Sequence, residues 1–228
     1  MKTNLLSFAV ACLLLLAGCS KEDTEIVQKN PLKSYQSGTN NGFFWSLWKS
    51  TGSTGTVNYT NGSAGNYKVS WSGFTGNFTC GKGWSSGSTN RVIGYNFGVY
   101  SNSGGGTSGY YGWSRNPYYE YYVNEKWGSV APTGGTKLGS FSSDGGTYNV
   151  YKNPEPNAGN IDGGTGFTQI YSSRTSQQGS GNHTITFGNH YNKWKSYGYT
   201  LGSLGIAAIM VTETWGTNTS GNVNVTIW

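Results

Sequence analysis

The chain has 228 residues, of which 37 are glycine, 15% are aromatic and only 11% are charged. Without a Gly-X-Y repeat this glycine content excludes collagen, and the aromatic content argues against a disordered chain. The 15 basic and 9 acidic residues give a net charge of +6, but the basic residues are scattered singly, so we expect no nucleic-acid partner.

The N-terminal segment has the pattern of a secretion signal. Lys2 precedes an apolar run, Leu5–Ala17, that is shorter than the roughly 20 residues a membrane-spanning helix needs. The run ends in Leu16-Ala17-Gly18-Cys19, which resembles the lipobox of bacterial lipoproteins, in which the cysteine becomes the lipidated N-terminus. We therefore expect a lipoprotein signal peptide over residues 1–18 and a lipid on Cys19, with an ordinary secretory signal as the alternative. The expected protein is secreted, anchored to a bacterial membrane only through this lipid, and exposed at the cell surface.

Residues 19–41 are mostly polar and have no apolar periodicity, so we expect a tether between the lipid and the folded part. From residue 42 to residue 228 the composition is uniform and predicts a single domain, which we expect to be a monomer. Cys80 is the only cysteine of that domain, because Cys12 leaves with the signal peptide. An intrachain disulfide is therefore excluded, even in an oxidising compartment.

Short runs of alternating polar and apolar residues, typical of strands, recur through the domain. They cover Asn66–Trp71, Val92–Tyr100, Tyr118–Trp127, Thr147–Tyr151, Phe167–Ser172, Thr184–Phe187, Ile206–Trp215 and Val223–Trp228. Asn-Gly and Asp-Gly pairs between several runs favour the positive φ that tight hairpins need. One segment, Asn189–Tyr197, has helical spacing instead, with Asn189 as its expected N-cap and Gly198 as its end. The pattern predicts an all-β antiparallel sandwich with a single short helix.

Two carboxylates stand in the middle of expected strands. Alternation places Glu120 on one face with two tyrosines, and Glu213 on one face with Val211 and Trp215. Loss of water around such a carboxylate raises its pKa. Two of them on one aromatic face would titrate as the acid pair that glycoside hydrolysis needs. The residues alone leave open whether they meet or are two unrelated structural acids.

The remaining titratable residues predict structural roles. Glu125 has the opposite parity to Glu120 on the same strand, so we expect it on the opposite face. Asp144 and Asp162 each precede Gly-Gly and are expected in turns. His183 and His190 lack the spacing of metal ligands, so we expect no metal and no other cofactor.

The segment Asn116–Val123, with the sequence NPYYEYYV, resembles the nucleophile strand of family 11 glycoside hydrolases, the small endo-β-1,4-xylanases. Val211–Trp215, followed by a Ser-Gly turn and a closing strand, is similar to their acid/base strand. Further matching motifs lie in the family's order between about Phe43 and Trp228, namely Asn77-Phe78, Gly81–Trp84, Tyr111–Trp113, Asp144–Tyr148, Phe167–Gln169 and Asn189–Trp194. The resemblance implies a β-jelly roll sandwich of two twisted antiparallel sheets with one short α-helix and a concave cleft, with residues 42–228 as the catalytic domain.

The resemblance also implies a reaction and a set of site residues. The reaction is the endo-hydrolysis of β-1,4-xylosidic linkages in xylan by a retaining double displacement, with Glu120 as the nucleophile and Glu213 as the acid/base. Around these acids the resemblance places Tyr111 and Tyr122 at the reaction centre, Trp48 as a stacking platform for a xylose, Gln169 and Tyr171 along the cleft, and Asn77 beside Glu213. Family members with Asp at this last position work in acid, so Asn77 implies a near-neutral or alkaline-tolerant optimum.

Three positions depart from the family's pattern. Glu155 stands where the family has Arg, Ala207 stands where it has Tyr, and the loop over the cleft reads GNIDG at 159–163 in place of Pro-Ser-Ile-Asp/Glu-Gly. We expect Glu155 to add negative charge near the cleft and Gly159 to loosen the loop. Two alternative functions are a carbohydrate-binding sandwich without catalysis, which would not need the two glutamates, and a hydrolase of another β-1,4-glycan.

Overall fold

The computed structural model describes residues 25–26, 29–30 and 33–228. The expected signal peptide and the lipidation site Cys19 lie outside the described residues. Within the part of the chain that is described, no helix is both long enough and apolar enough to cross a membrane.

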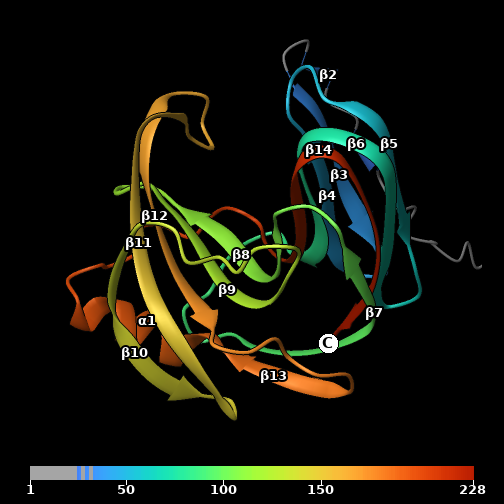
Figure 1. The fold of residues 1–228 in the computed structure, drawn as a ribbon. Helices are drawn as coiled ribbons and strands as arrows, with labels where there is room; N and C mark the ends of the chain where they lie inside the picture. Colours follow the sequence, from blue (N-terminus) through green and yellow to red (C-terminus); the bar gives the residue numbers. More distant parts are fainter. Residues whose placement is uncertain (1–24, 27–28, 31–32) are drawn as a thin grey trace, which may run out of the picture.

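The described residues form strands and one helix (Figure 1). In chain order these are β1 (Glu25–Ile26), β2 (Lys29–Asn30), β3 (Lys33–Asn40), β4 (Phe43–Lys49), β5 (Thr54–Asn61), β6 (Gly65–Trp84), β7 (Val92–Asn102), β8 (Thr107–Ser114), β9 (Tyr119–Trp127), β10 (Thr136–Ser143), β11 (Gly146–Gly159), β12 (Thr165–Arg174), β13 (Asn182–Thr186), α1 (Phe187–Ser196) and β14 (Ala208–Ile227).

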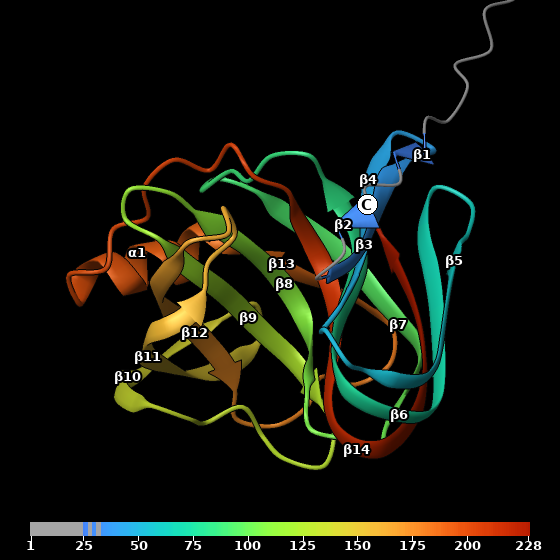
Figure 2. The same ribbon diagram turned by 90° about the horizontal axis from the view of Figure 1, so that it is seen from above.

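The strands build two layers that share two long strands. The inner layer has the order β3-β4-β6-β14-β8-β9-β12-β11-β10, and the outer layer contains β5, β7, β13 and the other halves of β6 and β14. Figures 1 and 2 show the inner layer curled, with the β11–β12 hairpin on one side and β5 and β6 on the other. The expected two-layered, strongly twisted all-β fold is confirmed. One pairing differs, because β9 and β12 run parallel, whereas we expected antiparallel sheets throughout.

Glycines at one level of β6 and β14 allow these strands to pass from one layer to the other. Gly76 pairs with Gly216, and both have positive φ, +126° and +136°. The ladder between the two strands shifts register just beyond this pair, as at a β-bulge. A side chain would strain a backbone with such φ values, so glycine fits the bend. The bend places the N-terminal half of β14, which carries Glu213, in the inner layer.

The core lies between the layers, and a second apolar cluster lies on the concave face of the inner layer. Aromatic and branched side chains fill the core, with Phe187 and Trp194 of α1 among them. The concave cluster consists of Tyr122, Tyr151, Tyr171, Ile209 and Val211. Because burial of apolar area dominates folding, the core between the layers stabilises the sheet. Polar side chains lie beside the concave cluster and are available for a site.

The N-cap of the helix lies three residues before the expected position. Thr186 is its N-cap, and the backbone N–H and hydroxyl of Thr186 both donate to the carboxylate of Asp144, at 2.9 and 2.7 Å. Asn189, the expected cap, lies in the first turn and donates to Ser143 Oγ. The expectation was wrong because the acceptor at this helix start comes from the distant β10–β11 turn. Gly198, with φ of +88°, follows the helix end as expected.

The folded part also extends further toward the N-terminus than expected. Strand β3 pairs along its length with β4, so the tether expected over 19–41 is wrong for residues 33–40. Asn41 and Gly42, with φ of +51° and +81°, form the tight hairpin turn between the two strands. The polar sequence of β3 suits a strand near a sheet edge, where one face meets water.

Candidate active site

Side chains from neighbouring strands stand in register on the concave face. Tyr111 of β8 is opposite Tyr122 of β9, which is opposite Tyr171 of β12, which is opposite Tyr151 of β11. Directly opposed residues in a sheet share a face. The next row toward one end contains Trp113, Glu120, Gln169 and Asn153, again on four successive strands. The row of four tyrosines therefore forms the part of the concave face next to Glu120.

Glu120 is held by donors on both carboxylate oxygens. The Tyr111 hydroxyl donates to Oε1 at 3.1 Å, and Gln169 Nε2 donates to Oε2 at 2.9 Å. Tyr122 also hydrogen-bonds this carboxylate. The indole N–H of Trp113 donates to the Tyr111 hydroxyl at 2.6 Å, which leaves the hydroxyl proton of Tyr111 for Glu120. The side chain is only 9% exposed, so these donors replace most of its water.

Glu213 lies on the same face, on β14. It is 7% exposed, and Asn77 Nδ2 donates to its Oε1 at 3.2 Å. The Tyr122 hydroxyl lowers the pKa of Glu213 as well as that of Glu120, which places this tyrosine near both acids. Trp48 occupies the same row as Glu213, because Trp48 is opposite Thr79 and Thr79 is opposite Glu213.

The two carboxyls have different acidities. Burial, and then the negative charge of Glu120, raise the pKa of Glu213 to about 8. Burial also raises the pKa of Glu120, but the donors Gln169, Tyr122 and Tyr111 oppose this rise. At neutral pH Glu213 therefore holds its proton.

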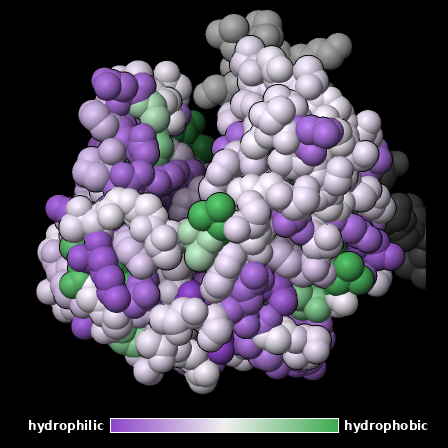
Figure 3. All heavy atoms as spheres, viewed as in Figure 1, coloured by the Kyte–Doolittle hydropathy of each residue, from purple (hydrophilic) through white to green (hydrophobic). Residues whose placement is uncertain are grey.

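Both walls of the concave face contribute to a pocket of about 380 Å³. Figure 3 shows the surface hollowed between the two sides of the curled sheet. The pocket lining includes the expected site residues Asn77, Tyr122, Gln169, Tyr171 and Glu213. Glu120 and Tyr111 join these residues through the hydrogen bond from Gln169, whereas Trp48 does not line the pocket. The individual roles of all these residues stay predictions.

The chain matches the family model described as Glycosyl hydrolases family 11 over residues 40–226. The chain belongs to glycosyl hydrolase family 11. It is similar to "Probable endo-1,4-beta-xylanase B" of Aspergillus clavatus, with 40% identity over 93% of this chain and 92% of that protein. It is also similar to "Endo-1,4-beta-xylanase 11A" of Botryotinia fuckeliana, with 39% identity over 90% and 88% of the two chains. A solved structure from a comparison of two major endo-1,4-β-xylanases of Trichoderma reesei has a TM-score of 0.69 and 35% identity, and the likeness covers 77% of this chain and 93% of that one.

Some residues of this family 11 cleft were missed by the sequence analysis. Trp113 orients Tyr111, Trp215 and residues 130–134 line the pocket, and Asn153 contacts Gln169. The Tyr171 hydroxyl donates to the carbonyl of Gly134, which ties residues 130–134 to the cleft wall. The spacing of Asn153, two residues after the buried Tyr151 on one strand, is the sequence signal that places it on the concave face.

The loop between β11 and β12, residues 160–164, is called the thumb here. Asn160 Oδ1 accepts the backbone N–H groups of Asp162 and Gly164, both at 3.1 Å. Asp162 accepts from Arg115 Nε at 2.7 Å, from Arg115 Nη2 at 2.5 Å and from the Tyr118 hydroxyl at 2.9 Å. These bonds anchor the thumb of the family 11 chain to the β8–β9 connection, and they oppose the loosening that we expect from Gly159.

We expect Asp162→Ala to raise KM for the substrate by roughly two- to fivefold, the size expected of an exposed ion pair, with kcat retained. Arg115→Ala should have the same effect, and the double variant should be no worse than either single one. Steady-state kinetics of the three variants measure this. Additive effects of the two substitutions would mean that Asp162 and Arg115 act separately.

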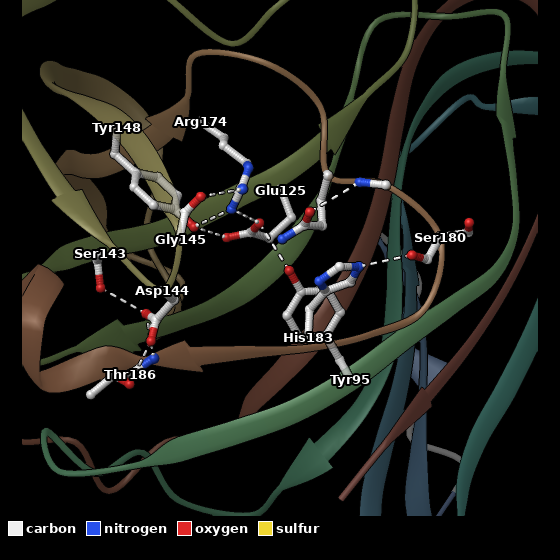
Figure 4. A network of polar contacts seen from close by, with 12 residues as sticks. Tyr95, Glu125, Ser143, Asp144, Gly145, Tyr148, Arg174, Ser180, His183 and Thr186 are labelled. Carbon is white, nitrogen blue, oxygen red and sulfur yellow. Dashed lines mark hydrogen bonds and ion pairs between the residues drawn. The ribbon is translucent and has the colours of Figure 1, made fainter.

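Glu125 lies on the opposite face of β9, as expected from its parity, and is fully buried. Figure 4 shows its carboxylate between Tyr95 on one side and Tyr148 and Arg174 on the other. The two hydroxyls donate at 2.9 and 2.6 Å, and Arg174 Nη1 lies at 3.4 Å. Burial raises the pKa of Glu125 to about 7 despite these partners. This cluster belongs to the core of the family 11 fold and not to its cleft.

We expect Glu125→Ala to lower the free energy of unfolding by about 3–5 kcal/mol, because it leaves the partly buried guanidinium of Arg174 and two fully buried hydroxyls without their acceptor. A carboxyl with a raised pKa in the folded state makes folding less favourable as the pH rises from about 4.5 to 7. Glu125→Gln should therefore flatten part of this decline. Urea unfolding at several pH values measures both effects, and equal pH slopes for wild type and Glu125→Gln would contradict the account.

Proposed function

We propose that this chain is a retaining endo-β-1,4-xylanase, with Glu120 as the nucleophile and Glu213 as the acid/base. The observation that carries the proposal is the pair of buried carboxyls in one cleft: Tyr111 and Gln169 donate hydrogen bonds to Glu120, and burial, followed by the charge of Glu120, raises the pKa of Glu213 to about 8. The names of the relatives support xylan as the substrate.

In the first step, Glu213 donates its proton to the glycosidic oxygen while Glu120 attacks the anomeric carbon. The C–O bond to the leaving sugar breaks, and an ester bond forms between the anomeric carbon and Glu120. Retaining enzymes hold the two carboxyls about 5–5.5 Å apart, which leaves no room for a water molecule between them. Tyr111 and Gln169 hold Glu120 in the orientation for attack.

In the second step, water attacks the anomeric carbon and Glu213 takes the proton of that water. The charge of ionised Glu120 is one cause of the raised pKa of Glu213. Once Glu120 is esterified that charge is gone, so the pKa of Glu213 falls and the residue becomes a base. The charge of Glu120 thus adds to the effect of burial in the first step and is absent in the second, which suits Glu213 to both roles.

The purified chain should release reducing ends from xylan and much less from cellulose. Glu120→Gln is the matched control, because it keeps the aromatic cleft and removes the proposed nucleophile. Binding of xylan without release of reducing ends would favour the carbohydrate-binding alternative. Faster release from cellulose than from xylan would favour a hydrolase of another β-1,4-glycan.

We further propose that Cys19 carries a lipid that holds the enzyme at a bacterial surface, a proposal that rests on the sequence Leu16–Cys19. We expect the wild-type protein in the membrane fraction and Cys19→Ala in the soluble fraction, each with the same activity per molecule. Fractionation without detergent, followed by immunoblotting, measures this. Wild-type protein found mainly in the soluble fraction would contradict the proposal.

A further inference from the structure

Two polar residues of β11 extend the hydrogen bonding of Glu120 away from the aromatic wall. Asn153 Nδ2 donates to Gln169 Oε1 at 3.2 Å and to Glu155 Oε1 at 2.6 Å. Gln169 Nε2 in turn donates to Glu120 Oε2 at 2.9 Å. The four side chains form one continuous row, with a carboxylate at each end and two amides between them.

The chemistry of the row gives both amides one orientation. An ionised carboxylate only accepts hydrogen bonds, so Asn153 must present its amide NH₂ to Glu155. The same nitrogen reaches the oxygen of Gln169, and the NH₂ group of Gln169 is then left for Glu120. Glu155 thus fixes the row from its outer end and does not depend on the charge of Glu120, which disappears when an ester forms.

The titratable groups around Glu120 come from several strands. Tyr111 on β8 and Tyr122 on β9 are donors, and Glu213 on β14 is the second buried acid. Glu155 on β11 is half-buried, and its negative charge raises the pKa of Glu120, an effect smaller than that of burial and of the three donors. The chain therefore has an acidic residue at the outer end of this row, at a position where the family resemblance led us to expect arginine.

We propose that Asn153 and Glu155 are positioning residues for the nucleophile: they hold the Gln169 amide with its NH₂ group toward Glu120. The inference rests on the proposed role of Glu120. It adds two residues of β11 to the machinery, and the charge of Glu155 contributes to the acidic side of the pH profile.

Glu155→Gln separates charge from hydrogen bonding, because its amide oxygen still accepts from Asn153. We expect the acidic limb of the kcat/KM profile to move to lower pH, with the maximal value changed less than about twofold. Lys152→Gln is the matched control. It also removes one charge from β11, but Lys152 lies over the ring of Tyr199 and away from the row. An acidic limb that does not move in Glu155→Gln would overturn the proposal. So would an acidic limb that moves by the same amount, in either direction, in Lys152→Gln.

Asn153→Asp should have the opposite effect. An acceptor between Glu155 and Gln169 adds charge and reverses the Gln169 amide, so we expect the acidic limb to move up. Asn153→Ala should lower kcat by roughly three- to tenfold, because the Gln169 donor is no longer held. An acidic limb that moves the same way in Asn153→Asp and Glu155→Gln, or an Asn153→Ala variant with wild-type kcat, would contradict the positioning role.

A readout independent of activity separates this inference from the proposed function. In protein labelled with ¹³C at the glutamate carboxyl carbons, the Glu120 signal is the one that Glu120→Gln removes. We expect its titration to move down in Glu155→Gln and up in Asn153→Asp. If the chain does not cleave xylan but these shifts occur, the proposed function fails and the positioning stands. If the chain cleaves xylan and the Glu120 titration is the same in all variants, the positioning fails.

Discussion

Glu120→Gln should lower the rate of xylan hydrolysis by at least about four orders of magnitude while leaving the fold intact, because an amide cannot form the glycosyl ester. The amide has the size of the carboxyl it replaces and still accepts from Tyr111 or Gln169. Measurement of kcat/KM on xylan, with far-UV circular dichroism and Tm as the test of folding, gives the result.

Glu213→Gln should lose activity in a way that depends on the leaving group. Xylan needs a proton on its departing oxygen, whereas an aryl xyloside with an acidic phenol needs little protonation. We therefore expect a much smaller loss of kcat/KM on the aryl substrate than on xylan.

Glu125→Gln is the matched control for Glu120→Gln, since it makes the same change on the opposite face of β9. A loss in folded Glu125→Gln as large as that in Glu120→Gln would show that the assignment is wrong.

The second large effect is expected from Asn77→Asp, which should move the pH optimum of kcat/KM downward by about one unit or more. Asn77 donates to Glu213 Oε1 at 3.2 Å and does not titrate. In wild type the basic limb therefore reports loss of the Glu213 proton, near pH 8. An aspartate at this distance shares that proton with Glu213, and the two acids titrate as a pair.

Two effects oppose each other in this variant. Simple repulsion between the introduced carboxylate and Glu213 would raise the pKa of Glu213 and move the basic limb upward. The active state, however, needs the new pair to keep its shared proton while Glu120 is ionised, and this is a minor state that is best populated at low pH. We expect the second effect to prevail. An optimum that stays in place or moves to higher pH would contradict this account of Asn77.

The sequence was sufficient for features that depend on alternation within one strand. The parity of Glu120 and Glu125 on β9 correctly separated the carboxylate of the cleft from the one in the core. Alternation also indicated β9, β11, β12 and the N-terminal half of β14 in the inner layer, but it did not indicate β3, β4, β8 or β10. These features are local, because successive side chains of a strand point to opposite faces whatever the strand pairs with.

Features that depend on distant partners were not predictable from the sequence. Residues 206–215 and 223–228 looked like two strands. They belong to one strand, β14, which continues through the bend because β6 pairs with it both before and after the bend. The start of the helix depends on Asp144, which is 42 residues before Thr186. The contact between Asn153 and Gln169 requires the register of β11 against β12. No short-range pattern contains these pairings.

Trapping of the covalent intermediate tests the proposed mechanism most directly. In a xylobioside with a reactive leaving group, fluorine at C2 slows both steps. The reactive leaving group speeds the first step alone, so the ester forms faster than it is hydrolysed and accumulates. Mass spectrometry of the protease-digested protein should find the added sugar on the peptide that contains Glu120, and on Glu120 itself after fragmentation. The same experiment on Glu120→Gln should give no adduct. An adduct on Glu213 or Glu125, or turnover of the unmodified substrate with inversion at the anomeric carbon, would contradict the account.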